Sequence, residues 1–554
     1  MISRSRPPDA KDIGIEVTLK GDELTSDDTQ TDQSNVQHML VVKPPLVVSP
    51  QSSSKDRGEM LQTGLKELRR VIIQEMPIRL LYFQQHNSKL KISLLEKSEI
   101  YKIISLQFRN DFYNGRSLTN WIPKHVGYAI LSHTWTRKPG EMTYDAWQKF
   151  DVDDPKCRKL INFCKAAYED HRLTLGWIDT ICINKESSAE LDESIRSMYA
   201  WYSKASVCIT YLAETASISE MPKDSWFTRG WTLQELVAPP HIKFYDKHWR
   251  QLIDFSNNDK EDPLILDGIE RATTIRPDEL VNIRGTSISR RMQLAAMREV
   301  TRVEDSTYSL MGIFNISIST AYGEGAERAF FRFLKELFDS TKDVSDLLNW
   351  GGEYPSSWTP VTSLFPSKPV DFIARSSKVL PWYPIKPLTL THLGLRTLVL
   401  LMPAMPIDNN GRDIFFDLCP FGDYYAGVDA LHPILYQNDG TKHSNIPEAY
   451  YILDKRCFEK GSNNLAEDRD AWKFGTLNIE ADNTSIYIPK TCLAVLLRKG
   501  NKETSMSTEY RKVYTYHPIV FELEKRNNVA TQSCYRIAQD QLGRHGMQLA
   551  TLYL

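Results

Sequence analysis

The stretch Tyr128–Trp135, with the sequence YAILSHTW, is the first strong indication of the fold. It begins with a short run of apolar residues, which is typical of a strand buried in a parallel sheet. The run ends in a polar cluster, Ser132, His133 and Thr134. Open α/β sheets bind ligands at the carboxyl ends of their strands. We therefore expect a ligand site at this end of the predicted strand.

Three further strands follow along the chain, at Leu175–Ile183, Val207–Leu212 and Ile242–Tyr245. The first of these is a continuous apolar run that only Asp179 interrupts. A helical pattern separates each strand from the next, and this alternation is the signature of a doubly wound α/β sheet. We expect a doubly wound α/β sheet with a helical extension, followed by a β-rich C-terminal domain.

Two of the intervening helices have clear start signals. Asp154 followed by Pro155 supplies an N-cap and a proline at the first helical position. Ser187 and Glu190 have the spacing of a capping box, in which each residue's side chain bonds the backbone N–H of the other. Farther along, Ser289–Thr301 and Glu304–Phe314 each read as one helix.

The third intervening helix lies in Ser225–Pro240, SWFTRGWTLQELVAPP. Trp231 and Glu235 are four residues apart, so they share one face of this helix. Pro239 has no backbone N–H and disfavours a helical conformation before it, which ends the helix. A carboxylate one turn from an indole is not placed like an ordinary solvated charge, and this is the first hint of a function.

Length and composition limit the possible classes of protein. A chain of 554 residues is too long for one core, so two or three units are expected. We divide it into a disordered tail (1–70), an α/β core with a helical extension (76–345, with the core at about 120–250 and the extension at 251–345) and a β-rich domain (346–554). Lys+Arg 68 nearly balances Asp+Glu 70, so no nucleic-acid partner is expected.

The cysteines and the apolar runs indicate a cytoplasmic protein. The eight cysteines never form C-x-x-C, and we expect reduced packing residues, with neither a metal site nor a disulfide framework. The N-terminus lacks the apolar core of a signal peptide. The longest uncharged apolar run, Thr397–Ile407, contains two prolines and is too short to span a bilayer. No membrane partner is expected.

Four segments resemble, in the expected order, the fungal HET (heterokaryon incompatibility) domain. They are YAILSHTW, GWIDTICINKESSAELDESIRSMYAWY, SWFTRGWTLQELVAP and RVEDSTYSLMGIF…AYGEGAERAF. The last resembles the form common in mushroom-type fungi. The resemblance covers roughly residues 76–340 and continues more weakly in SLFPSKPVDFI and HLGLRTLVLLMP.

The resemblance implies a trigger of cell death in non-self recognition between fungal individuals. The HET family is distantly similar to TIR domains, which are flavodoxin-like modules, and some of these cleave NAD⁺. The resemblance therefore implies a TIR-like, flavodoxin-like sheet. RGWTLQEL resembles the TIR motif W-C-x-x-E-L, whose glutamate is catalytic, and that glutamate corresponds to Glu235. The usual cysteine of the motif is replaced by Thr232.

Cleavage of the bond between nicotinamide and ribose passes through an oxocarbenium-like cation, which a carboxylate in a partly dry pocket stabilises. On this reading Glu235 is catalytic and NAD⁺ is the substrate, with no further cofactor. The residues expected to line or bind the substrate are Ser132, His133, Trp135, Asp179, Arg229 and Trp231. Trp226 and Trp231 are also read as core or wall aromatics.

Each of these roles has an alternative. Glu235 can be an ion-pair partner of Arg229, and Arg229 can instead hold a phosphate of the nucleotide. Asp179 is favoured as a residue that fixes a turn. His133 can be a polar loop residue without chemistry.

Two functions remain open at this stage. One is an NAD⁺ nucleosidase that self-association switches on. The other is a non-catalytic interaction module that recruits death partners, with Glu235 as a relic. The chain has no G-x-x-x-x-G-K-[ST] sequence, so we expect an unknown upstream partner, the β-rich domain or the tail to supply activation.

Overall fold

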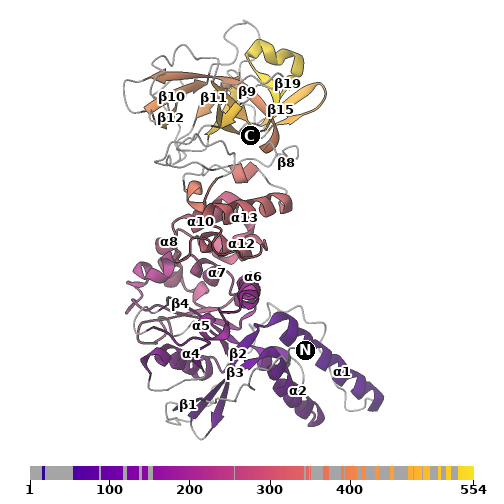
Figure 1. Cartoon of the computed structure of the whole chain (residues 1–554), viewed down its shortest axis with the longest axis vertical. Coiled ribbons are helices and arrows are strands. Elements are labelled where there is room, and N and C mark those ends of the chain that lie inside the picture. Colours follow the sequence, from indigo (N-terminus) through magenta and orange to yellow (C-terminus); the bar gives the residue numbers. More distant parts are fainter. Residues whose placement is uncertain are drawn as a thin grey trace, which may run out of the picture. The chain divides into compact units, whose positions relative to one another are not determined.

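The computed structural model describes a large part of the chain, and Figure 1 labels its helices and strands. The described residues are 15–18, 54–86, 89–116, 121–135, 140–147, 154–254, 256–341, 345–348, 350, 366–373, 389–391, 394–408, 413–418, 431–435, 450–454, 472–477, 479–489, 491–499, 510–512, 519–525 and 534–553. They fall into two units, Met1–Val281 and Asn282–Leu554, which we call the first and second units.

Among the described residues, the first unit forms one seven-stranded sheet with the order β1-β3-β2-β5-β4-β6-β7. The strands are β1 (Ile15–Thr18), β2 (Arg79–His86), β3 (Lys89–Glu96), β4 (Ala129–His133), β5 (Leu175–Trp177), β6 (Val207–Tyr211) and β7 (Ile242–Tyr245). The helices are α1 (Ser54–Arg70), α2 (Lys97–Tyr113), α3 (Trp121–Val126), α4 (Arg158–Glu169), α5 (Asp179–Cys182), α6 (Ser188–Lys204), α7 (Thr232–Val237), α8 (Pro263–Thr273) and α9 (Pro277–Val281).

The second half of this sheet is parallel, as predicted. β4 pairs in parallel with β5 on one side and β6 on the other, and β6 pairs in parallel with β7. Taken in chain order, these four strands have the arrangement 2-1-3-4, the order of flavodoxin-like sheets. The chain direction across the sheet changes at β4, so the carboxyl end of β4 lies at a topological switch point.

The first half is antiparallel, which makes the sheet mixed rather than purely doubly wound. β2 and β3 form a hairpin, and β2 pairs with β5. Gly176 of β5 permits this pairing, because a Cβ there would lie 2.7 Å from the ring of Phe83 and 2.9 Å from the ring of Phe163. The apolar sequence PIRLLYF (77–83) is typical of a strand and corresponds to β2, whereas the sequence pattern did not predict β3 or the antiparallel pairing.

The apolar run of β4 is buried as predicted. Ala129, Ile130 and Leu131 are 0%, 0% and 1% exposed. α6 is tied to the same strand by a hydrogen bond of 2.8 Å, which the Tyr202 hydroxyl donates to the carbonyl of Leu131. The N-cap of Asp154 is also confirmed, since its side chain accepts the backbone N–H of Lys156.

Two local predictions in this unit are wrong in part. The strand predicted at Leu175–Ile183 ends at Trp177, and α5 follows it. A short apolar run is compatible with either a strand or a buried helical turn, and tertiary packing decides between them. Ser187 does cap α6, but the carboxylate of Glu190 does not close the capping box. It instead accepts hydrogen bonds from Arg79 and, at 2.7 Å, from the backbone N–H of Asn184.

The predicted disordered tail is also wrong in part. α1 occupies the end of the 1–70 segment and lies beside α2 (Figure 1). Its buried residues Leu61, Leu65 and Leu68 follow helical spacing, so this segment does have apolar surface to bury. β1 lies in the same segment and pairs with β3.

The second unit begins with helices α10 (Ile288–Ala296), α11 (Asp305–Tyr308), α12 (Met311–Phe314) and α13 (Ala326–Ser340). The helix predicted at Ser289–Thr301 ends earlier, at Ala296. The single helix predicted at Glu304–Phe314 is two short helices, and the second ends at Asn315 in a left-handed conformation with a φ of 57°.

The rest of the second unit is β-rich, as predicted. Its described strands form a ten-stranded and a three-stranded sheet, and their pairings are antiparallel. The strands are β8 (Thr389–Thr391), β9 (Gly394–Asp408), β10 (Asp413–Leu418), β11 (Leu431–Leu435), β12 (Tyr450–Asp454), β13 (Trp472–Thr476), β14 (Glu480–Ala481), β15 (Ser485–Pro489), β16 (Thr491–Lys499), β17 (Tyr510–Lys512), β18 (Ile519–Lys525), β19 (Cys534–Ala538) and β20 (Gln548–Tyr553).

The boundary between the units differs from the predicted one at residue 345. α10 packs with the helical turn Pro369–Phe372, and the backbone N–H and hydroxyl of Ser289 both donate to the carboxylate of Asp346. These contacts join the later helices of the predicted extension to the β-rich part. The apolar segment Met39–Val48 lies outside the described residues.

The cysteines with described side chains are free and buried, as predicted for packing residues. They are Cys157, Cys164, Cys182, Cys208 and Cys492. Within the described part of the chain, no helix is both long and apolar enough to cross a membrane.

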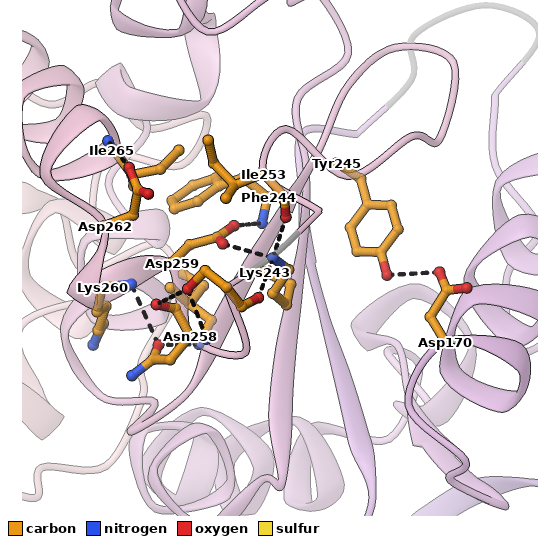
Figure 2. A network of polar contacts seen from close by, with 12 residues as sticks. Asp170, Lys243, Phe244, Tyr245, Ile253, Asn258, Asp259, Lys260, Asp262 and Ile265 are labelled. Carbon is orange, nitrogen blue, oxygen red and sulfur yellow. Dashed lines mark hydrogen bonds and ion pairs between the residues drawn. The ribbon is translucent and has the colours of Figure 1, made fainter. Parts of the chain in front are cut away.

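A buried ion pair fixes the edge strand β7, and Figure 2 shows its contacts. The Lys243 ammonium lies 2.7 Å from the carboxylate of Asp259, and the two residues are 1% and 0% exposed. Lys243 also donates to the carbonyls of Ile253 and Ser256, at 2.6 and 2.8 Å. Asp259 accepts the backbone N–H of Phe244. The pair thereby ties β7 to the segment that follows it.

We expect Lys243→Met to destabilise the chain by about 3–5 kcal/mol, because it leaves the Asp259 carboxylate buried without its counter-ion. Urea unfolding of the full chain measures this loss. The matched control is Arg271→Ala, which removes an ion pair to Asp267 whose side chains are 58% and 64% exposed. It should change the free energy of unfolding by no more than about 0.5 kcal/mol. Equal losses in the two variants would contradict the structural role of Lys243.

Candidate functional site

The site lies at the carboxyl end of β4, where Ser132 and His133 are the last residues of the strand. Helix α7 brings Glu235 to the same place. α7 ends before Pro239 as predicted, and the backbone N–H of Glu235 lies 3.4 Å from the carbonyl of Trp231, which confirms the four-residue spacing of the helical turn. Residues from widely separated parts of the sequence thus meet at the predicted edge of the sheet.

A chain of two hydrogen bonds ends on the carboxylate of Glu235. The indole N–H of Trp226 donates to the hydroxyl oxygen of Ser132 at 2.8 Å, and that hydroxyl donates to Oε2 of Glu235 at 2.5 Å. Trp226 and Ser132 are 0% exposed and Glu235 is 8% exposed. The carboxylate is therefore held by a donor that is itself fixed by a second donor.

Burial raises the pKa of Glu235 to about 8, because a charged carboxylate loses its hydration there. The hydrogen bond from Ser132 opposes this shift, while the negative charge of Asp179 adds to it. The charge of Arg229 and a hydrogen bond with Tyr202 also lower the pKa. With a pKa of about 8, the carboxyl group is mostly protonated at pH 7.

A second polar cluster surrounds His133. Its Nε2 lies 2.9 Å from Oε2 of Glu141 and 3.9 Å from Oδ1 of Asp179. The ammonium of Lys159 donates to the other oxygen of Glu141 and, at 2.8 Å, to the carbonyl of Thr134. Burial acts to raise the pKa of Glu141, but His133 and Lys159 outweigh it and hold this pKa far below its usual range.

The loop after β4 carries an exposed indole. Trp135 is 49% exposed, and its N–H donates to Oδ2 of Asp179 at 3.0 Å. The ammonium of Lys185 lies 3.7 Å from the centre of the indole ring and 3.7 Å from the Asp179 carboxylate. Asp179 thus contacts three side chains and joins the loops that follow β4 and β5.

The structure brings the predicted residues into two adjoining groups. Ser132 and Glu235 form the first, and His133, Trp135 and Asp179 form the second. Arg229 and Trp231 are half-buried and precede Glu235 in the sequence. Arg229 acts on Glu235 through its charge. Contact of any of these residues with a substrate stays a prediction.

Sequence reasoning missed three residues of this region. Trp226 was read only as a core or wall aromatic, although it donates to Ser132. Glu141 and Lys159 carry no short motif, since Glu141 reaches His133 from a loop and Lys159 reaches Glu141 from α4. Thr232, which replaces the usual cysteine of the TIR motif, has its hydroxyl 2.6 Å from the carbonyl of Trp226 and 2.9 Å from that of Arg229.

A hollow of about 220 Å³, partly open to solvent, adjoins the second cluster. It is lined by Leu131, Glu141, Met142, Lys156, Lys159, Leu160, Ile178, Thr180 and Ile181. Neither Ser132 nor Glu235 is among the residues that line it.

The fold and the site define an α/β domain with a buried carboxylate at the switch point of its parallel strands. Residues 128–222 match the family model described as "Heterokaryon incompatibility protein (HET)". The "Vegetative incompatibility protein HET-E-1" of Podospora anserina is 34% identical over 237 residues. This match covers 40% of the present chain and 17% of that protein. No solved structure matches the chain significantly.

The sequence resemblance to HET domains is therefore confirmed by the family match over residues 128–222. The family match includes Ser132, His133, Trp135 and Asp179, and it ends before Trp226 and Glu235.

The raised pKa of Glu235 makes the stability of the chain depend on pH. In the unfolded chain a glutamate titrates near about 4.3. Between that pH and about 8 the folded chain retains a proton that the unfolded chain has lost, so stability falls as pH rises. We expect the wild type to lose stability relative to Glu235→Gln from pH 5 to pH 8, by about 1.4 kcal/mol per pH unit, and to level off above pH 8.

Urea unfolding of the wild type and of Glu235→Gln from pH 5 to pH 9 measures the difference between their free energies of unfolding. The contributions of the other titrating groups are the same in both proteins and cancel in this difference. Glu193→Gln on α6 is the matched control, since Glu193 is exposed. Its difference from the wild type should be constant with pH. A constant difference for Glu235→Gln as well would show that Glu235 is ionised throughout and that burial does not shift its pKa.

Proposed function

We propose that this HET-domain protein triggers cell death in fungal non-self recognition, and that it does so by cleaving NAD⁺ with Glu235 as the catalytic carboxylate. The incompatibility role is supported by the family match and by the similarity to a vegetative incompatibility protein. Since the chain matches only 17% of that relative, no more of the relative's function is transferred.

The observation that carries the enzymatic proposal is the position of Glu235. Its carboxylate lies beside the carboxyl end of β4, at the switch point where flavodoxin-like sheets bind their ligands. The strand order β5-β4-β6-β7 supports the TIR-like fold that the motif RGWTLQEL suggests. Carboxylates with strongly shifted pKa values are also common at catalytic sites.

The reaction breaks the bond between C1 of the ribose and the ring nitrogen of nicotinamide. The electron pair leaves with nicotinamide, which becomes neutral, so no strong general acid is required. The positive charge that develops on the ribose is stabilised by the ionised carboxylate of Glu235. Water then adds to C1 and releases a proton to the solvent.

The site also sets two conditions for this chemistry. Glu235 must be ionised, and the donor Ser132 and the cation Arg229 both favour ionisation. Glu235 is only 8% exposed, so the substrate needs more access than this structure gives. Self-association that moves the loop after β4 or the segment before α7 would supply that access, in line with an activity that is switched on.

The same burial supports a second function, a non-catalytic module that recruits death partners. A buried carboxylate with a buried hydrogen-bonding partner can have a purely structural role, in which it holds α7 against β4. In that case the exposed side chains around Trp135 would contact the partner.

Nicotinamide release from NAD⁺ by the concentrated full chain distinguishes the two functions. For the enzyme we expect release to fall about a hundredfold or more in Glu235→Gln, because the cation loses its stabilising charge. Below about pH 8 the rate should rise roughly tenfold per pH unit, since only the ionised carboxylate acts. Glu193→Gln should leave the rate unchanged.

Toxicity in fungal cells provides the second measurement. For the enzyme, Glu235→Gln should abolish killing at normal expression while Glu193→Gln kills as the wild type does. Killing that persists in Glu235→Gln, together with no nicotinamide release from any of the proteins, would establish the interaction module instead.

A further inference from the structure

We propose that Trp226 is a positioning residue, whose indole N–H fixes the hydroxyl of Ser132 as a hydrogen-bond donor to the carboxylate of Glu235. The consequence for catalysis rests on the proposed function of Glu235. The consequence for the protonation of Glu235 does not, and the two can be measured separately.

The direction of the two hydrogen bonds follows from the chemistry of the groups. An indole N–H can only donate, so the hydroxyl oxygen of Ser132 accepts at 2.8 Å. The hydroxyl hydrogen then lies away from Trp226, and the carboxylate oxygen of Glu235 lies 2.5 Å from the hydroxyl oxygen. Hydrogen bonds in such a chain polarise one another, so the first bond strengthens the second.

The indole of Trp226 is itself fixed from several sides. Its backbone N–H donates to Asp224 at 3.0 Å, and its carbonyl accepts the hydroxyl of Thr232 at 2.6 Å. Its ring meets Phe227 and Phe244 edge-on, at centroid distances of 4.9 and 5.9 Å. Thr232 is the first residue of α7, so the helix that carries Glu235 also holds the backbone that places the donor.

The position of the hydroxyl hydrogen determines which form of Glu235 is stabilised. A hydroxyl that donates to the carboxyl group stabilises the anion. The N–H of Trp226 occupies one of the two lone pairs of the Ser132 oxygen, so without it this oxygen becomes a better acceptor for the proton of a neutral carboxyl group. Trp226 therefore favours the ionised form, against the effect of burial.

The other groups that act on Glu235 come from three elements, α5, α6 and β6, and from the segment before α7. Asp179 of α5 opposes ionisation through its negative charge, and Arg229, before α7, favours it. Tyr202 of α6 and Cys208 of β6 are buried, and burial raises the pKa of each well above its usual value. Both stay neutral at physiological pH, and the hydrogen bond with Tyr202 favours the ionised form of Glu235, as the one from Ser132 does.

The competing explanation is that Trp226 only packs the core. It is 0% exposed and surrounded by aromatic rings, so its replacement destabilises the chain under either explanation. Loss of packing lowers stability at every pH by the same amount. Loss of the donor also moves the pH at which Glu235 titrates, and only this second effect tests the proposal.

The experiment measures that titration in the full chain. For each background, urea unfolding from pH 5 to pH 10 gives the stability difference between the protein with Glu235 and the same protein with Glu235→Gln. This difference falls as pH rises and levels off at the pKa of Glu235 in the folded chain. We call this pH the midpoint, because half of the folded molecules are ionised there. The backgrounds are the wild type, Trp226→Phe and Ser132→Ala.

Two further variants are matched controls. Trp121→Phe removes a buried indole N–H that donates to Asp111 at 2.8 Å, and Ser289→Ala removes a buried hydroxyl that donates to Asp346 at 2.6 Å. Both lose the same kinds of hydrogen bond away from Glu235. They should lower stability and leave the midpoint where it is.

We expect the midpoint to rise by about one pH unit in Ser132→Ala and by about half a unit in Trp226→Phe. An unmoved midpoint in a folded Trp226→Phe protein overturns the proposal and leaves Trp226 as a packing residue. If Trp226→Phe does not fold, replacement of Trp226 by benzothienylalanine, which keeps the bicyclic ring and has sulfur in place of N–H, decides by the same midpoint.

Nicotinamide release measured on the same proteins separates this proposal from the proposed function. If both hold, the acid limb of the pH–rate profile rises in pH together with the midpoint. A midpoint that moves in proteins that release no nicotinamide supports the positioning role and contradicts the enzymatic function. Release with an acid limb that is the same in Trp226→Phe and in the wild type supports the enzyme and contradicts the positioning role.

Discussion

The burial of one carboxylate at the end of β4 is the constraint on which the candidate site depends. Glu235 is placed there because α7 is short, begins at Thr232 and ends before Pro239. Removing it from water raises its pKa to about 8, and the surrounding residues only partly compensate. Ser132 occupies a fully buried strand position where an apolar residue would pack more readily, and it supplies a donor to the carboxylate. The polar end of β4 therefore does more than end the strand, because its Ser132 hydroxyl lowers the pKa of Glu235.

Much of the fold could be predicted because its signals are local. The apolar run of β4, the N-caps at Asp154 and Ser187 and the proline after α7 act within a few residues, and all were confirmed. The errors occur where distant contacts decide. Three features depend on residues far away in sequence, which no periodicity reveals. They are the end of β5, the bond between Glu190 and Arg79, and helix α1 at the end of the predicted tail.

The same distinction explains what was found and what was missed in the site. Glu235 and Ser132 could be singled out because one follows a tryptophan by a helical turn and the other ends a buried strand. Trp226 looks like any core aromatic in sequence, and only the fold shows that its N–H meets Ser132, 94 positions away. Glu141 and Lys159 likewise acquire a role only through His133.

The energetics of the site also bear on how the proposed lethal activity would be contained. Below about pH 8 the neutral carboxyl group is the more stable form, and it does not stabilise a cation. Ionisation requires donors and positive charge, and substrate binding requires more access than an 8% exposed side chain offers. A rearrangement that opens the site to solvent would lower the cost of ionisation at the same time, because water would again hydrate the carboxylate. Access and charge are thus coupled through one physical term, desolvation, so that a closed site is both inaccessible and chemically inactive.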